Sequence, residues 1–212
     1  MIKYIAFDFD GTLVDSKEVF LDIFNQIAEK RGFQKLNAGN IEHLRTLSIT
    51  ERCNFLKVPL YKVPFIAIEF LKDYKKSIDR LVLIDGIREV LEQLHNQGFE
   101  LVIISSNSEK NIRTFLNLQG ISCIRQIFCS SNIFGKESLI RKFLKSSGLN
   151  TSEVIYAGDE VRDIEACRKA GIPVIWVNWG YDLREIAEPH KPDFIAEKPS
   201  DIVQIISSKL PS

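Results

Sequence analysis

The spacing of apolar residues in the first part of the chain predicts one strand and then only helices. Residues 2–9 form a short, mostly apolar and aromatic run that is typical of a strand. Apolar residues then recur at helical spacing over 19–28, and residues 40–57 and 64–79 also favour helices. No segment between these helices has the features of a strand. We therefore expect residues 16–80 to form a small all-helical domain, inserted directly after the first strand.

From residue 85 onward, apolar runs alternate with helical periods. The expected strands cover 101–104, 124–129, 154–157 and 173–178, and the expected helices include 108–118, 161–170 and 200–208. Strands and helices that alternate with short connections favour βαβ units around a parallel sheet. The sequence thus predicts an α/β fold, a Rossmann-like parallel sheet with helices on both faces, built from residues 1–15 and 81–212.

Length, charge and cysteine content narrow the class of protein. The 212 residues suit one full domain and a small second one. The 28 basic and 28 acidic residues cancel, so no basic surface points to nucleic acid or to an anionic membrane. No apolar run reaches the ~18 residues of a membrane span, and the four cysteines lack CxxC spacing. We expect a cytoplasmic protein with reduced thiols, as a monomer or homodimer.

Two aspartates follow directly on the first strand, in the segment Phe7-Asp8-Phe9-Asp10-Gly11. Side chains two positions apart on a strand share a face, so Asp8 and Asp10 point the same way. Two carboxylates ~4 Å apart repel by roughly 4 kcal/mol at an effective dielectric constant near 20. Aspartates that cap a turn are the simpler alternative, but a pair such as this favours a cation, a shared proton or a reaction. Gly11 allows a sharp turn or a close approach to a ligand.

Polar segments also follow two later strands. Ser105-Ser106-Asn107 comes after the strand at 101–104, and Gly158-Asp159-Glu160-Val161-Arg162-Asp163 comes after the strand at 154–157. Lys136 stands just before the helix between those strands. Taken alone, these residues could be helix caps or a solvent-exposed lysine. Ligands of open parallel sheets bind beyond the carboxyl ends of the strands, so together the segments predict an active site at that edge.

These segments resemble, in order, the four motifs of the haloacid dehalogenase superfamily of phosphatases and phosphotransferases. The motifs are Asp8-Phe9-Asp10-Gly11-Thr12-Leu13, Ser105-Ser106-Asn107, Gly135-Lys136 and the GDxxxD segment at 158–163. The resemblance covers residues 2–178. The helical insert resembles the C1 cap of phosphoglycolate phosphatase-like members.

The resemblance implies a role for each motif residue. Asp8 is the expected nucleophile and Asp10 the general acid/base, while Ser105, or Ser106 one position on, binds the transferring phosphoryl group and Lys136 neutralises charge. Asp8, Asp10, Asp159 and Asp163 are the expected metal-binding residues. Four carboxylates and a phosphorylated substrate need a divalent cation, and oxygen ligands favour Mg²⁺.

The implied function is a magnesium-dependent phosphatase that hydrolyses a small phosphorylated metabolite, phosphoglycolate-like, through an aspartyl-phosphate. Gly11, Ser106 and Asn107 are expected to bind the substrate. Arg45 is a candidate for binding the end of the substrate away from the phosphoryl group, and an ordinary surface position for Arg45 is equally compatible with the sequence. A phosphomutase or phosphotransferase acting on a sugar phosphate, or a non-catalytic binding protein of the same fold, are the alternatives. A dehalogenase would not need an acid/base at Asp10.

Overall fold

The computed structural model describes residues 1–130, 132 and 135–208, and its main feature is a six-stranded sheet in which all neighbouring strands are parallel. The spatial order is β5–β4–β1–β6–β7–β8. The strands are β1 (Tyr4–Phe7), β4 (Glu100–Ser105), β5 (Ile124–Cys129), β6 (Val154–Gly158), β7 (Val174–Val177) and β8 (Phe194–Ala196). This sheet confirms the predicted α/β class.

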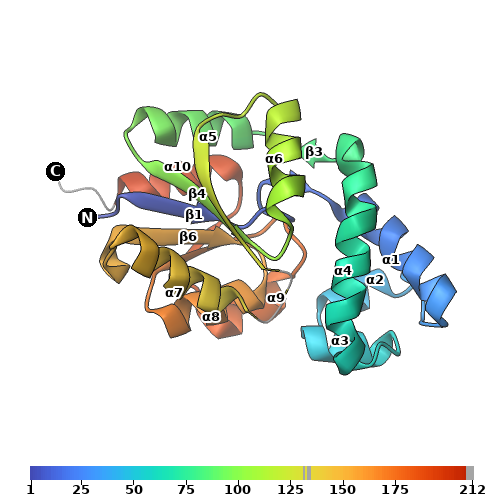
Figure 1. Ribbon diagram of the computed structural model, residues 1–212. Coiled ribbons are helices and arrows are strands. Elements are labelled where there is room, and N and C mark those ends of the chain that lie inside the picture. The colour runs from blue at the N-terminus through green and yellow to red at the C-terminus, as the bar shows by residue number, and fades with distance from the viewer. Residues whose placement is uncertain (131, 133–134, 209–212) are drawn as a thin grey trace.

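Helices cover both faces of the sheet because every central strand is apolar on both sides (Figure 1). One face carries α5 (Ile87–Asn96), α6 (Glu109–Leu118) and α10 (Pro199–Ser207), and the other carries α7 (Lys136–Ser147) and α8 (Val161–Ala170). Side chains alternate between the two layers along each strand. On β1, Ile5 and Phe7 belong to the first layer and Ala6 to the second. The sheet therefore has two apolar cores, one on each side.

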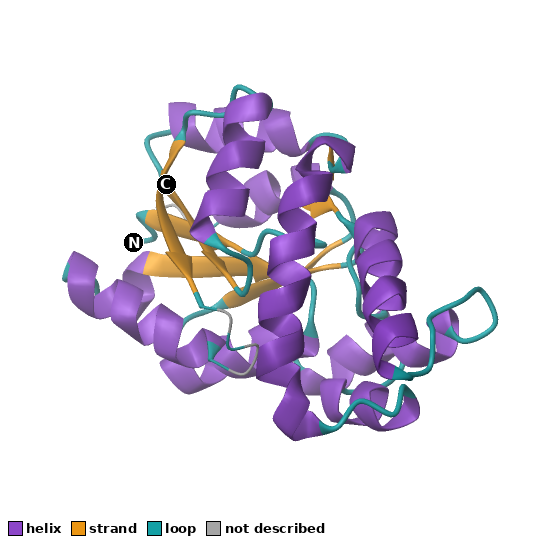
Figure 2. Cartoon of the chain, turned by 45° about the vertical axis from the view of Figure 1, so that its right-hand side comes forward, coloured by secondary structure: helices purple, strands orange, loops and turns teal. Residues whose placement is uncertain are grey.

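The segment after β1 forms a helical insertion beside the carboxyl ends of the strands (Figures 1 and 2). It contains α1 (Lys17–Arg31), α2 (Ile41–Arg45), α3 (Ile49–Phe55), the short 3-10 helix Leu60–Lys62, α4 (Val63–Tyr74) and a second 3-10 helix, Lys75–Arg80. β2 (Val14–Asp15) pairs antiparallel with β3 (Val82–Leu83) where the chain enters and leaves the insertion. The predicted helical insertion is confirmed, and its division from the core at residues 16 and 80 stays a prediction.

Some elements differ from the sequence-based prediction. The expected helix over 40–57 is two helices, because Ser48 begins a new one: its hydroxyl accepts a hydrogen bond from the Glu51 N–H (3.4 Å), and the Glu51 carboxylate accepts one from the Ser48 N–H (2.8 Å). The two-residue strands β2 and β3, the short strand β8 and the one-turn helix α9 (Arg184–Ala187) were not predicted. Elements this short carry too few residues to show a period.

Among the helices that the structure describes, none is long and apolar enough to cross a membrane. All four cysteines are free thiols; Cys167 is buried and the other three are half-buried.

Candidate active site

The order of the strands explains why the predicted site residues converge. β1 lies between β4 and β6, so the residues that follow these three strands meet at one edge of the sheet. Asp8 follows β1, Ser105 ends β4, and Asp159 follows β6. The helical insertion lies beside the same edge (Figure 1).

Lys136 bridges two of the aspartates. Its ammonium group donates to Asp8 Oδ2 at 2.5 Å and to Asp163 Oδ1, and all three side chains are at least 96% buried. The second Asp8 oxygen, Oδ1, accepts a hydrogen bond from the Phe9 N–H at 2.7 Å. Burial alone would lower the pKa of Lys136, but the negative charges of Asp163 and Asp8 raise it above its ordinary value. Lys136 therefore carries a positive charge that offsets part of the negative charge of the site.

Asp8, Asp159 and Asp163 form a buried cluster of three carboxylates. One oxygen of each lies within 4.8 Å of the others. Burial, and then the charges of Glu160, Asp163 and Asp8, raise the pKa of Asp159 well above its usual range, and burial raises the pKa of Asp163 to about 6 even though the Lys136 charge opposes it. Three ionised carboxylates in this cluster are therefore disfavoured unless a further cation joins Lys136. An all-carboxylate donor set of this kind fits a hard divalent cation such as Mg²⁺.

Two loops close tightly around Asp159. The Thr12 hydroxyl donates to Asp159 Oδ1 (2.8 Å), and the Tyr181 N–H donates to Asp159 Oδ2 (2.7 Å). Gly11 has a φ of +79°, and a Cβ at this position would lie 2.3 Å from Asp159 Oδ2. At Gly180, a Cβ would lie 2.0 Å from the Cβ of Asp159. The close approach expected at Gly11 is therefore made to Asp159, and contact between Gly11 and a substrate stays a prediction.

The surroundings of Asp10 differ from those of Asp8. The Tyr74 hydroxyl donates to Asp10 Oδ1 at 2.5 Å, and the Asn107 side-chain amide donates to Oδ2 at 2.8 Å. Burial raises the pKa of Asp10, and these two hydrogen bonds partly lower it. Asp10 is not one of the three clustered carboxylates, so its part in metal binding stays a prediction. Its contacts with Tyr74 and Asn107 suit a group that gives and takes a proton.

The segment after β4 is held by contacts within the site. The buried Ser105 hydroxyl accepts from the Asn107 N–H at 3.2 Å, and the Ser106 hydroxyl lies 3.4 Å from the Arg162 guanidinium. The Asn107 side chain is directed to Asp10. The predicted phosphate contacts of Ser105 or Ser106 and the substrate contact of Asn107 remain predictions.

Three basic side chains of the insertion hold the loop that follows β7. The Arg45 guanidinium donates to the carbonyl oxygens of Tyr181 (3.0 Å) and Gly180 (3.3 Å), and Arg52 forms an ion pair with Asp182. The Lys17 ammonium donates to the Trp179 carbonyl oxygen at 2.8 Å. Of these residues only Arg45 was singled out from the sequence, as a substrate contact. That role is untested, and the contacts made by Arg45 join the insertion to the core.

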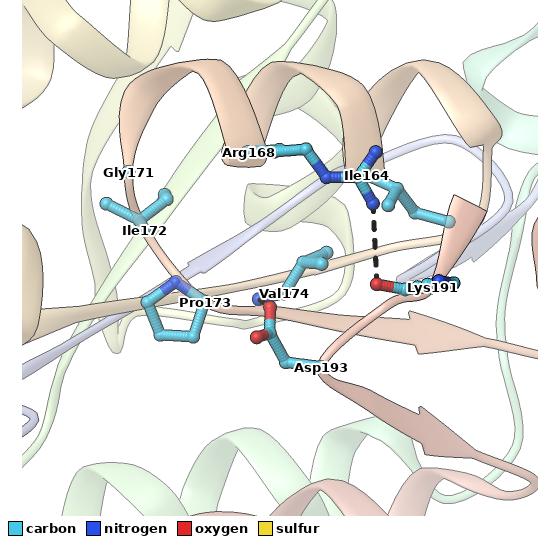
Figure 3. Close-up of a pocket in the computed structure, with 8 residues that line it drawn as sticks. All are labelled: Ile164, Arg168, Gly171, Ile172, Pro173, Val174, Lys191 and Asp193. Carbon is cyan, nitrogen blue, oxygen red and sulfur yellow. Dashed lines mark hydrogen bonds between the residues drawn. The ribbon is translucent and has the colours of Figure 1, made fainter.

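Two hollows in the part of the chain that the structure describes are lined by different residues. A cavity of about 380 Å³ begins at Asp10, Ser106 and Asn107 and continues into the helical insertion. The other, about 340 Å³ and shown in Figure 3, is lined by Arg168, Lys191, Asp193 and neighbouring residues, with Arg168 donating to the Lys191 carbonyl oxygen (3.5 Å). None of the predicted site residues lines the second hollow, so the candidate active site is the first.

Tyr74 is the clearest functional candidate that the sequence did not indicate. It is 1% exposed, it ends α4 in the insertion, and its hydroxyl reaches Asp10, which is 64 residues away in the chain. The only local signal is a hydroxyl at a buried position of an otherwise apolar helix face.

Comparison with known proteins agrees with this geometry. The profile of the family described as "Haloacid dehalogenase-like hydrolase" matches residues 5–177. A phosphoglycolate phosphatase from Synechococcus elongatus is 30% identical over 207 residues, which are 97% of this chain and 98% of that protein. The pyrophosphatase PpaX of Halalkalibacterium halodurans is 22% identical over 213 residues, 98% of each chain.

A solved structure of a predicted phosphatase from Clostridium acetobutylicum has the same fold, with a TM-score of 0.85 at 21% identity over 98% of this chain and 99% of that one. The family match runs from β1 to the end of β7 and includes the carboxylate cluster and the helical insertion, and the relatives named above are phosphatases. The chain therefore belongs to the haloacid dehalogenase-like hydrolases.

Proposed function

We propose that this protein is a magnesium-dependent phosphatase that hydrolyses a small phosphorylated metabolite through an aspartyl-phosphate on Asp8. The observation that carries the proposal is the contrast between two aspartates only two positions apart. Asp8 lies in the carboxylate cluster beside Lys136, whereas Asp10 is held separately by Tyr74 and Asn107. Two carboxylates in different environments suit two different roles.

In the proposed reaction, Asp8 attacks phosphorus and the bond to the leaving oxygen breaks, while Asp10 gives that oxygen a proton. Asp10 then takes a proton from the water that attacks the aspartyl-phosphate, and inorganic phosphate leaves. Lys136 offsets the charge on Asp8 and on the transferring group. Asp8, Asp159 and Asp163 would hold Mg²⁺, which supplies positive charge against the phosphoryl oxygens when bound.

Phosphoglycolate is the first compound to assay, because the sequence resembles that class and relatives of this chain bear the name phosphoglycolate phosphatase. Pyrophosphate is the second compound to assay, because the chain is also similar to pyrophosphatases named PpaX. A phosphatase transfers the phosphoryl group to water and releases inorganic phosphate, whereas a phosphotransferase transfers it to an acceptor such as a sugar phosphate. Release of inorganic phosphate therefore distinguishes the two.

The test is phosphate release from a set of small phosphate esters by the wild-type protein and by Asp8→Asn. The Asn side chain keeps the shape of Asp and removes the attacking charge, so the variant should fold and lose all turnover. Asp15→Asn, at an exposed position on β2, is the matched control and should keep wild-type rates. Wild-type rates in a folded Asp8→Asn protein would rule out the proposed nucleophile.

A further inference from the structure

The cavity that begins at Asp10 is mostly apolar once it enters the helical insertion. It passes between α1, α2, α3 and α4, and its volume is about 380 Å³. From this cavity we infer the class of substrate: a phosphate monoester whose alcohol part is apolar and extends into the insertion. This inference rests on the proposed function and adds the chemistry of the leaving group to it.

Each helix of the insertion contributes apolar side chains to the wall. Among them are Phe24 of α1, Leu44 of α2, Cys53 of α3, and Ile66, Ala67 and Phe70 of α4. Phe24, Leu44 and Ile66 are themselves buried. α3 leaves more of its surface uncovered, because it has no buried residue and Ile49 and Cys53, which line the cavity, are half-buried. Apolar surface that the protein leaves uncovered in a concave site is suited to an apolar ligand.

The cations at the rim of the cavity already have acceptors. Arg45 donates to the carbonyl oxygens of Gly180 and Tyr181, and Lys17 donates to that of Trp179. Arg52 is paired with Asp182.

Arg162, the remaining basic residue of the described lining, is paired with Glu160, to which its Nε donates at 2.6 Å. A substrate carboxylate placed at the rim would share cations that already face carbonyl oxygens or carboxylates, and deeper in the apolar part it would lose its water without compensation. An apolar group has no such cost, which favours it as the occupant.

The size of the cavity also favours a larger group than glycolate. At roughly 30 Å³ for each water-sized group, 380 Å³ has room for about a dozen non-hydrogen atoms. Glycolate brings only two carbons and three oxygens, and with the phosphoryl group at Asp8 these atoms would leave more than half of the cavity unfilled. An alkyl or aromatic alcohol of six to ten carbons, roughly, matches the volume.

The experiment uses the wild-type protein and unbranched alkyl phosphates from methyl to octyl, with phosphoglycolate and pyrophosphate alongside. Burial of one methylene corresponds to a factor of about four, so kcat/KM should rise roughly fourfold per carbon until the cavity is full. Hexyl phosphate should then exceed phosphoglycolate by at least about a hundredfold. A flat series, or a preference for phosphoglycolate or pyrophosphate over every alkyl phosphate, would overturn the inference and leave the phosphatase proposal standing. No turnover of any phosphate ester would overturn both.

A variant pair checks that the insertion is responsible. Ala67→Leu adds bulk inside the cavity, so the ratio of kcat/KM for hexyl to that for methyl phosphate should fall at least tenfold. Ile68→Phe adds bulk on the outer face of the same helix, where Ile68 is 61% exposed, and should keep the wild-type ratio. The same ratio in wild type and a folded Ala67→Leu protein would show that the alkyl chain binds elsewhere.

Discussion

The hydrogen bond between Tyr74 and Asp10 makes the proposed acid/base residue depend on the helical insertion for one of its donors. Tyr74→Phe removes only the hydroxyl, because the ring keeps its buried position at the end of α4. Asp10 then loses the Tyr74 donor to Oδ1 and keeps the Asn107 amide on Oδ2. We predict that this variant folds normally and transfers the leaving-group proton poorly.

The size of the effect follows from the kind of hydrogen bond lost. A hydrogen bond to an ionisable carboxylate contributes ~1.5–3 kcal/mol, which corresponds to a loss of about ten- to a hundredfold in rate. The Tyr74 hydrogen bond also lowers the pKa of Asp10. Its removal therefore raises that pKa, keeps Asp10 protonated to higher pH, and should move the alkaline limb of the pH–rate profile upward.

The assay compares kcat/KM for an alkyl phosphate, whose alkoxide leaves only with a proton, and for p-nitrophenyl phosphate, whose phenolate leaves without one. We expect the loss on the alkyl phosphate and little change on the nitrophenyl ester. Tyr61→Phe, which removes the same atom at a position that is 73% exposed, is the control. Equal losses on both substrates would show that Tyr74 has only a structural role, and no loss on either would refute the positioning of Asp10 by Tyr74.

Three further predictions concern the metal and the carboxylate cluster. EDTA should abolish phosphate release, Mg²⁺ should restore it and Ca²⁺ should not, because Ca²⁺ takes a larger and looser ligand shell; full activity in EDTA would contradict this. Lys136→Met leaves Asp8 and Asp163 without their cation. The free energy of unfolding, measured by urea denaturation in EDTA, should therefore fall by ~3–5 kcal/mol, and a decrease below ~1 kcal/mol would contradict this prediction. Gly180→Ala should displace Asp159, because the added Cβ would overlap its side chain, and should lower kcat/KM by about a hundredfold and weaken Mg²⁺ binding measured by calorimetry. Wild-type kcat/KM and wild-type Mg²⁺ affinity in this variant would show that the loop can shift without cost.

The core of the fold could be predicted from the sequence because each strand carries a local signal. The central strands are continuous apolar runs buried on both faces, and the polar residues that follow them stand out against those runs. β5 and α8 have the predicted bounds, 124–129 and 161–170. The meeting of Asp8, Lys136 and Asp163 followed from the motif order, since parallel strands bring their carboxyl ends to one edge.

Contacts between the insertion and the core could not be predicted, because no local pattern records them. Tyr74 reaches Asp10 across 64 positions, and Arg52 reaches Asp182 across 130. Neither pair shares an element or a period, so each side chain looks in the sequence like an ordinary residue of an amphipathic helix or a loop. The sequence pointed to a close approach at Gly11, but not to Asp159 as the group approached.

The most direct test of the proposed phosphatase is to find the phosphoryl group on the protein during turnover. The wild-type protein is mixed with a phosphate ester that it hydrolyses, quenched in acid within the first turnover, and digested for peptide mass spectrometry. We predict a phosphoryl group on the peptide that contains Asp8, and none in Asp8→Asn. Phosphate release without any phosphorylated peptide, or a phosphoryl group on another residue, would contradict the aspartyl-phosphate mechanism.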